Sequence, residues 1–171
     1  TYRDTIVTQN PQPSFVINGP ASNCGTFTAH FINTSTGATS YFCDWDDPTS
    51  SNPNSTAVNP SRKFSTMRGY DITLTASTQY CSRSITVPNA INIYRALPNF
   101  SFTQNQLCFP MQVQFTDLTG PAPAIQWGWN FNDGTTDSTG NPLHTFNAPP
   151  SIDSVSLWVR DTNGCVGTKK L

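Results

Sequence analysis

The sequence is poor in charged residues. Only 11% of its 171 residues are charged, against about 25% in average globular domains, and the net charge at pH 7 is -1. No basic cluster occurs, which argues against a nucleic-acid groove or a polybasic membrane patch. No apolar run approaches the roughly 20 residues of a membrane helix, so membrane insertion is not expected. The first residues also lack the pattern of a signal peptide, which indicates a mature chain or a fragment of a longer one.

Helical patterns are missing as well. No segment of ten residues or more has apolar residues at helical spacing, and Pro, Gly and Asn-Pro interrupt the chain at short intervals. Short alternating segments between these turns predict an all-β fold of β-sandwiches with about seven strands each. In the first sandwich we expect strands at residues 14–18, 26–33, 39–45, near 63, 70–77, and 84–87 or onward to 94.

Catalytic motifs are absent from the sequence. It has no G-x-S-x-G, H-E-x-x-H or P-loop pattern. Its two histidines, His30 and His144, stand singly. Spacing leaves open that two distant acids meet as a glycosidase pair, but no pair has a recognisable setting. We therefore predict that the protein is not an enzyme and carries no cofactor.

The chain contains two copies of one pattern, and the second copy carries an insertion of two residues before its signature. Before the insertion the matched pairs are Cys24 with Cys108, Phe27 with Met111, Ala29 with Val113 and Phe31 with Phe115. After it they are Tyr41 with Trp127, Cys43 with Trp129, Trp45 with Phe131, Asp47 with Asp133 and Arg62 with His144. The repeat predicts tandem domains at residues 11–96 and 97–171, the second ending within its last strand. Residues 1–10 would be a linker or the end of a preceding domain.

The second copy has the more specific motif. It runs from Trp127 to Gly134 and continues into Asn141-Pro142-Leu143-His144. The motif resembles the signature of the PKD domain, W-D-F-G-D-G followed by N-P-x-H-x-Y. The matching residues are Trp129, Phe131, Asp133, Gly134, Asn141, Pro142 and His144. The first copy is degenerate: it keeps Asp47 and has Trp45 at the Phe position, but Cys43, Pro48 and Arg62 stand in place of Trp, Gly and His.

The resemblance implies two tandem immunoglobulin-like, PKD-type β-sandwiches. In this family the domain is mostly a spacer or adhesive module, and His144 would be a structural hydrogen-bonding residue. The tandem domains are also similar to those of large Bacteroidetes cell-surface and gliding-type adhesins.

The cysteines repeat with the same spacing. Cys24 and Cys81 are 57 positions apart, and so are Cys108 and Cys165. We predict the structural disulfides Cys24–Cys81 and Cys108–Cys165, one in each sandwich, although the sequence alone allows other pairings. Cys43 is left over and is interpreted as a buried small apolar side chain rather than a reactive thiol. Disulfides in this composition indicate an extracellular or cell-surface location.

Two further features could bind a ligand. Asp44, Asp46 and Asp47, and in the second copy Asp133, lie in turns where carboxylates could hold calcium. Because neither turn has the EF-hand pattern, fixing of the turn by hydrogen bonds is the favoured interpretation.

Trp158 lies on the opposite parity from its neighbours Val155, Leu157 and Val159. It could stack on a sugar or a protein, or pack on a neighbouring strand or across a domain boundary.

Strand parity also predicts which residues of the signature strand face the core. The expected inward residues are Ile125, Trp127, Trp129 and Phe131.

The sequence as a whole predicts a non-catalytic extracellular repeat module. It would act as spacer and interaction surface in a large cell-surface adhesin or filament, with neighbouring repeat domains of the same chain as partners and surface glycans or proteins as further candidates. One alternative is an accessory substrate- or carbohydrate-binding module of a secreted hydrolase. Another is a self-assembling filament subunit, in which an outer strand of one chain completes a sheet of the next.

Overall fold

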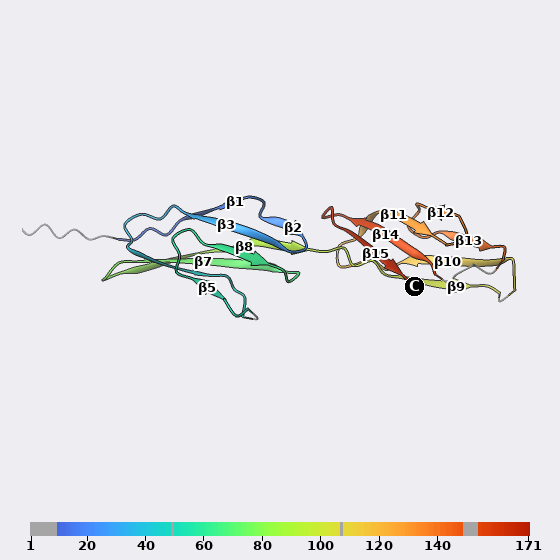
Figure 1. Ribbon diagram of the computed structural model, residues 1–171, viewed down its shortest axis with the longest axis horizontal. Coiled ribbons are helices and arrows are strands. Elements are labelled where there is room, and N and C mark those ends of the chain that lie inside the picture. The colour runs from blue at the N-terminus through green and yellow to red at the C-terminus, as the bar shows by residue number, and fades with distance from the viewer. Residues whose placement is uncertain (1–9, 49, 107, 149–153) are drawn as a thin grey trace, which may run out of the picture. The chain divides into compact units, whose positions relative to one another are not determined.

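The computed structural model describes residues 10–48, 50–106, 108–148 and 154–171, and all elements in these ranges are strands (Figure 1). One compact unit ends at Ile93, and a second begins at Tyr94; the boundary expected from the repeat lies at 96/97. None of the described elements is a helix that could cross a membrane. Residues 1–9, which include most of the expected linker, lie outside the described residues.

Unit 1 consists of two antiparallel sheets. The first has the order β1-β3-β6, with bounds Phe15–Asn18, Phe27–Asn33 and Ser61–Phe64. The second has the order β2-β8-β7-β4-β5, with bounds Ser22–Cys24, Ser82–Tyr94, Gly69–Ser77, Ser40–Asp44 and Asn54–Ser55. Burial alternates strictly along β7, which is why this segment has a two-residue apolar period.

Unit 2 repeats this arrangement with fewer strands. Its first sheet has the order β13-β10-β9, with bounds Leu143–Phe146, Met111–Asp117 and Phe100–Gln104. Its second has the order β12-β11-β14-β15, with bounds Thr136–Asp137, Ala124–Asn130, Ser156–Asp161 and Val166–Lys170. Each strand of unit 2 has a counterpart in unit 1, whereas β2 has no counterpart among the described strands of unit 2.

Aromatic side chains fill the space between the sheets of each unit. In unit 2, Trp129 and Phe115 are 1% and 2% exposed, and their ring centroids lie 5.3 Å apart. In unit 1, the rings of Trp45 and Phe31 lie 5.0 Å apart, and their equivalents in unit 2, Phe131 and Phe115, lie 5.4 Å apart. Such ring pairs add to the hydrophobic gain from burying large side chains.

The prediction that Ile125, at the start of the signature strand, faces the core is wrong. Trp129 and Phe131 are buried and Trp127 packs against the core, but Ile125 is 52% exposed. The pairing of β11 with β14 shifts register between Ala124 and Gln126. Because such a bulge changes which side chains face a given side of the sheet, Ile125 does not belong to the core.

The predicted disulfide pairs are wrong. Cys24 and Cys165 are disulfide-bonded, whereas Cys81 and Cys108 are exposed free thiols. In unit 1, Ala21 O accepts from Asn92 N at 2.8 Å, so β2 lies beside the end of β8, while Cys81 precedes its beginning. The eleven residues from Ser82 to Asn92 span about 30 Å, and the Cα atoms of a disulfide lie within about 7 Å.

In unit 2, Cys108 and Cys165 likewise lie at opposite ends of the strands. Gly167, two residues after Cys165, lies against Ala96 and Pro98, at the end of the unit where the chain enters. Cys108 precedes Met111, the first residue of β10, whereas the other end of β10, Asp117, pairs with Phe100 near the start of the unit. Equal spacing along the sequence therefore identified equivalent positions in the repeat, but not bonded pairs.

Cys43 is buried, at 4% exposed. Burial, with a smaller contribution from the charge of Asp44, raises the pKa of the Cys43 thiol to about 12. Because the thiolate is the reactive form, this side chain is an inert part of the core.

Alkylation should distinguish the exposed thiols from the buried one. In the monomer, without reductant, we expect iodoacetamide to modify Cys81 and Cys108 within minutes at about pH 8, where a free thiol is partly ionised. Cys43 should react only after unfolding, because it is buried and stays protonated. Peptide mass spectrometry of the native and urea-unfolded protein measures this difference; labelling of Cys24 or Cys165 in the native, unreduced protein would contradict the disulfide assignment.

Candidate functional site

The turn after β11 in unit 2 is fixed by its own side chains. Asn130 Oδ1 accepts from Asn132 N at 2.9 Å, and Asp133 Oδ1 accepts from Thr135 N at 3.0 Å and from Thr135 Oγ1 at 2.5 Å. Side chains of Asn and Asp commonly form such bonds to the backbone two residues on. The second oxygen of Asp133 is thereby directed away from the turn.

That oxygen meets His144 on the opposite sheet. Asp133 Oδ2 and His144 Nε2 are 2.7 Å apart, with side-chain exposures of 21% and 13%. The imidazole lies flat on Phe131, with centroids 3.9 Å and planes 3° apart. Since Asp133 follows β11 and His144 lies on β13, this contact joins the two sheets; we call it the sheet clamp.

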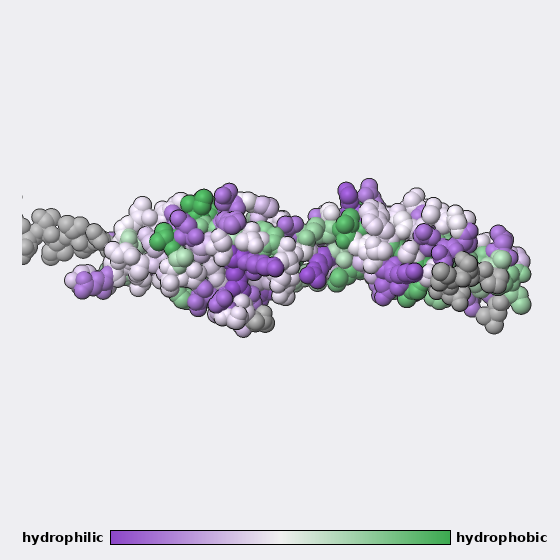
Figure 2. Space-filling model, in the orientation of Figure 1, coloured by the Kyte–Doolittle hydropathy of each residue, from purple (hydrophilic) through white to green (hydrophobic). Residues whose placement is uncertain are grey.

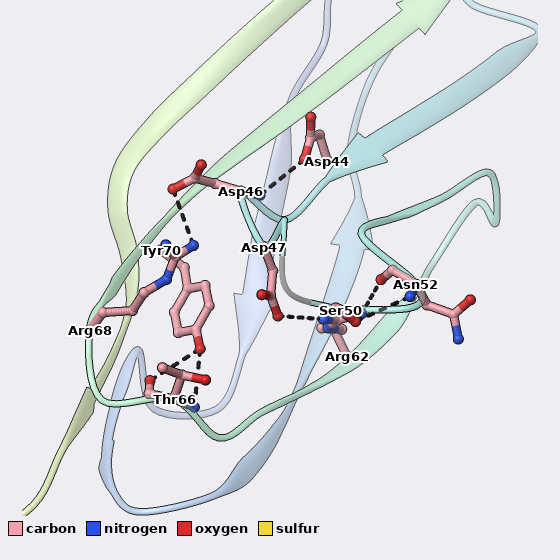
Figure 3. A network of polar contacts seen from close by, with 9 residues as sticks. All are labelled: Asp44, Asp46, Asp47, Ser50, Asn52, Arg62, Thr66, Arg68 and Tyr70. Atoms are coloured by element: carbon pink, nitrogen blue, oxygen red, sulfur yellow. Dashed lines mark hydrogen bonds and ion pairs between the residues drawn. The ribbon is translucent and has the colours of Figure 1, made fainter.

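Unit 1 has a sheet clamp of different chemistry at the same repeat positions (Figure 3). Arg62 on β6 pairs with Asp47, which follows β4, at 2.7 Å, and the side chains are 11% and 13% exposed. Arg62 also donates to Asn52 O, and its guanidinium lies 5.9 Å from the centre of the Phe64 ring. Unit 1 thus has an arginine where unit 2 has the signature histidine, and each of these basic side chains contacts an aspartate of the other sheet.

The turns also share an unusual backbone conformation. Asp46 and Asn132 occupy equivalent positions and have positive φ values of 50° and 59°. Asn132 stands where the PKD signature has Gly, the residue that adopts this conformation without strain. Asp and Asn are the non-glycine residues that tolerate it best, which explains the substitution in both units.

The carboxylates considered for calcium are engaged with protein groups. Asp47 faces Arg62, Asp133 faces His144, and Asp46 lies 3.3 Å from Arg68; Asp44 Oδ1 accepts from Asp46 N at 3.0 Å. In the parts of the chain that the structure describes, no three or more His, Cys, Asp or Glu side chains gather as a metal site would require. The geometry gives these residues a structural use, fixing turns and joining sheets.

Two other aspartates with structural roles were not singled out from the sequence. Asp117 accepts from Trp127 Nε1 at 2.7 Å and from Thr119 N at 2.9 Å. Asp161 is 0% exposed and accepts from the backbone N of Asn163 and of Cys165, both at 2.9 Å. The role of Asp161 could have been predicted from the turn sequence Asp161-Thr162-Asn163-Gly164.

Trp158 lies on the outer face of the second sheet of unit 2 and is 37% exposed. It pairs across the sheet with Gly128 and Thr168. A Cβ atom at Gly128 would lie 3.6 Å from the indole ring, so the ring partly covers that glycine. The remainder of the ring is accessible to a partner.

The comparisons with known proteins agree with the sequence motif. Residues 96–171 match the family model of the PKD domain. A search of the curated proteins found no match. Among solved structures, the one described as "Structure of amphioxus IgVJ-C2 molecule" is 11% identical and covers 88% of this chain and 97% of its own, with a TM-score of 0.38; a likeness this low carries no argument.

Removal of the histidine should weaken unit 2. We expect His144→Ala to lower the free energy of unfolding of unit 2 by about 2 kcal/mol, because it removes a hydrogen bond to a charged group and a ring contact. His144→Arg should retain most of the stability, since Arg62 holds this position in unit 1. Urea unfolding measures both. His30→Ala is the matched control, because His30 is exposed and bonds Ser61 at 2.7 Å; an equal loss there would contradict the sheet clamp.

Unit 2 should lose stability in acid. Burial raises the pKa of Asp133, but hydrogen bonds from Thr135 and His144 outweigh it and hold that pKa below its usual value. Hydrogen bonds from Thr139 likewise lower the pKa of Asp137. A carboxylate with a lower pKa in the folded state stabilises the fold above its unfolded pKa of about 4, and this stability is lost as pH falls through the folded value.

Asp137→Asn should therefore make the urea midpoint of unit 2 less dependent on pH between about 5 and 3. The measurement is tryptophan fluorescence in a Trp45→Phe background, so that the signal comes from unit 2. Asp46→Asn in unit 1 should leave this dependence unchanged. An unaltered acid slope in Asp137→Asn would refute the assignment.

Proposed function

We propose that this chain is a non-catalytic extracellular module that acts as spacer and interaction surface in a large cell-surface adhesin or filament. The observation that carries the proposal is the sheet clamp, present in both units with different chemistry. The most distinctive polar residues of each unit hold two sheets together, as expected of a module selected for a durable fold. The PKD match over residues 96–171 supports the same class of function.

The surface supports a role as a spacer. Figure 2 shows mostly neutral and hydrophilic surface on both units, with apolar surface in small areas. Disulfide-bonded Cys24 and Cys165 are compatible with an extracellular location. The Pro-containing segment Ala96-Leu97-Pro98, at the start of unit 2, would limit bending between consecutive domains.

A second candidate function rests on Trp158. An accessory module of a secreted hydrolase would use an exposed ring to stack on a sugar, and Trp158 has accessible ring surface beside Gly128. Only this one large aromatic side chain is exposed on the described outer face of that sheet. The partial covering of Gly128 by the ring explains its position without a ligand, so we rank this function second.

Binding to insoluble polysaccharides separates the two functions. If the protein is a spacer, we expect it to stay in the supernatant with cellulose, chitin and xylan, and Trp158→Ala to behave identically. Co-sedimentation followed by gel densitometry is the measurement, with Phe42→Ala, an exposed aromatic of unit 1, as the matched control. Binding that is lost in Trp158→Ala but kept in Phe42→Ala would establish the accessory module instead.

A further inference from the structure

The basic side chains of unit 2 are concentrated on two adjacent strands. Apart from Arg95, its lysine and arginine residues all lie on β14 and β15; they are Arg160, Lys169 and Lys170. Because side chains alternate along a strand, these three residues do not share one face of the sheet. Lys169 pairs with the buried Leu157 and lies on the core side. Arg160 and Lys170 are exposed on the outer side, which is also the side of Trp158.

Trp158 lies between the two outer cations. Arg160 is two residues further along β14. Lys170 pairs with Ser156, two residues before the tryptophan. Four residues of strand separate Ser156 from Arg160, a distance of about 13 Å, so the cations stand on either side of the indole. The indole reaches over Gly128 of the neighbouring strand, so the sheet supports one side of the ring while the ring keeps accessible surface.

No acidic side chain lies on this outer face among the residues that the structure describes. The other outward side chains of β11, β14 and β15 are uncharged: Gln126, Asn130, Ser156, Val166 and Thr168. The described aspartates of unit 2 accept hydrogen bonds from other groups. Within the described ranges, neither Arg160 nor Lys170 forms an ion pair. Both positive charges are therefore available to an external anion.

Unit 1 lacks this combination of side chains. At the positions equivalent to the tryptophan, the arginine and the lysine it has hydroxyl side chains, which are Thr75, Ser77 and Thr86. Thr75 and Thr86 each bond a hydroxyl of the neighbouring strand at 2.8 Å. Unit 1 exposes Phe42 on the same face, with the acidic Asp44 two residues away. Since the strand pairing is the same in both units, the fold does not require an aromatic ring between two cations.

We propose that the outer face of β14 and β15 binds an extended acidic polysaccharide. One sugar ring would stack on Trp158, and acidic groups on either side of that ring would meet Arg160 and Lys170. The apolar face of a sugar ring suits an indole. An arginine binds a carboxylate through two parallel hydrogen bonds, and a lysine acts as a point charge. The proposal rests on the role as interaction surface proposed above and names the chemical class of the ligand.

The arrangement favours a polysaccharide over other polyanions. Exposed ion pairs contribute little individually, so two cations alone would hold a polyanion weakly and the indole must supply part of the affinity. Polyglutamate has no ring that could stack in this way. Single-stranded nucleic acid has rings, but proteins bind it in basic grooves that follow its backbone, and this face has only Arg160 and Lys170. The disulfide-bonded cysteines also indicate an extracellular location, where acidic polysaccharides occur.

The test is binding of the full chain to sodium alginate coupled to agarose beads, in the presence of EDTA. Alginate is a linear polysaccharide with a carboxylate on every sugar. Depletion of protein from the supernatant measures the affinity at ~50 mM and ~500 mM salt. We expect binding at the lower salt concentration and weaker binding at the higher one, because salt screens exposed charges.

Substitutions on the outer face should each weaken binding to alginate. Trp158→Ala should lower the affinity about tenfold, because it removes the stacking surface. Arg160→Gln and Lys170→Gln should each lower it about threefold and reduce its dependence on salt. These side chains are exposed, so the variants should remain folded, and urea unfolding checks this.

Lys169→Gln is the matched control. It removes the same charge from the residue adjacent to Lys170, but its side chain lies on the core side, so the affinity should stay close to that of the unchanged protein. Phe42→Ala in unit 1 should likewise have no effect. Absence of binding at low salt, an equal loss in Lys169→Gln and Lys170→Gln, or unchanged binding in Trp158→Ala would overturn the proposal. Equal binding of polyglutamate or of oligothymidine, with the same response to the variants, would also overturn it.

This experiment is separate from the test of the proposed function. Cellulose and chitin carry no acidic groups, so binding to them does not depend on Arg160 or Lys170. Binding to alginate without binding to cellulose or chitin would support both the spacer and its interaction surface. Binding to cellulose or chitin that is lost in Trp158→Ala would instead replace the spacer by the accessory module, whatever the result with alginate.

Discussion

The sheet clamp is the interaction on which each unit depends. A β-sandwich is held mainly by non-directional apolar contact, which does not by itself fix how the loops of one sheet meet the other. The pair of Asp133 with His144, and that of Asp47 with Arg62, adds a directional contact between the sheets at 2.7 Å in each unit. His144 lies on the buried Phe131 ring, and the Arg62 guanidinium lies 5.9 Å from the centre of the buried Phe64 ring, so the polar contact and the core position each other.

The two units show which parts of the repeated motif are chemical and which are geometric. His144 and Arg62 differ in size, charge and hydrogen-bond geometry, yet both approach an aspartate across the sheets. Asn132 and Asp46 differ in charge, yet both have positive φ. Both units therefore retain a basic side chain that faces a carboxylate, and a turn residue with a left-handed backbone conformation. The residue types at these positions differ between the units.

Most of the fold could be predicted from the sequence, because strand period, turn residues and repeat spacing are local properties. The strand at Tyr70–Ser77, the buried Trp129 and the inert Cys43 all follow from such patterns. The exposure of Ile125 could not be predicted, since the bulge between Ala124 and Gln126 depends on pairing with Asp161 and Arg160, which lie 37 and 34 residues further along the chain (161 − 124 = 37, 160 − 126 = 34). The partners of Asp117 and Asp161 likewise depend on contacts that only the folded chain creates.

The sequence by itself determined the fold class, the two-fold repeat and the positions equivalent between the copies. Only the tertiary structure decided which cysteines bond and which carboxylates face a basic side chain. The physical reason is that a disulfide or an ion pair requires atoms to approach within a few ångströms. Strands about 20 to 30 Å long can place residues of identical spacing at opposite ends of a sheet, and only the folded chain fixes those ends.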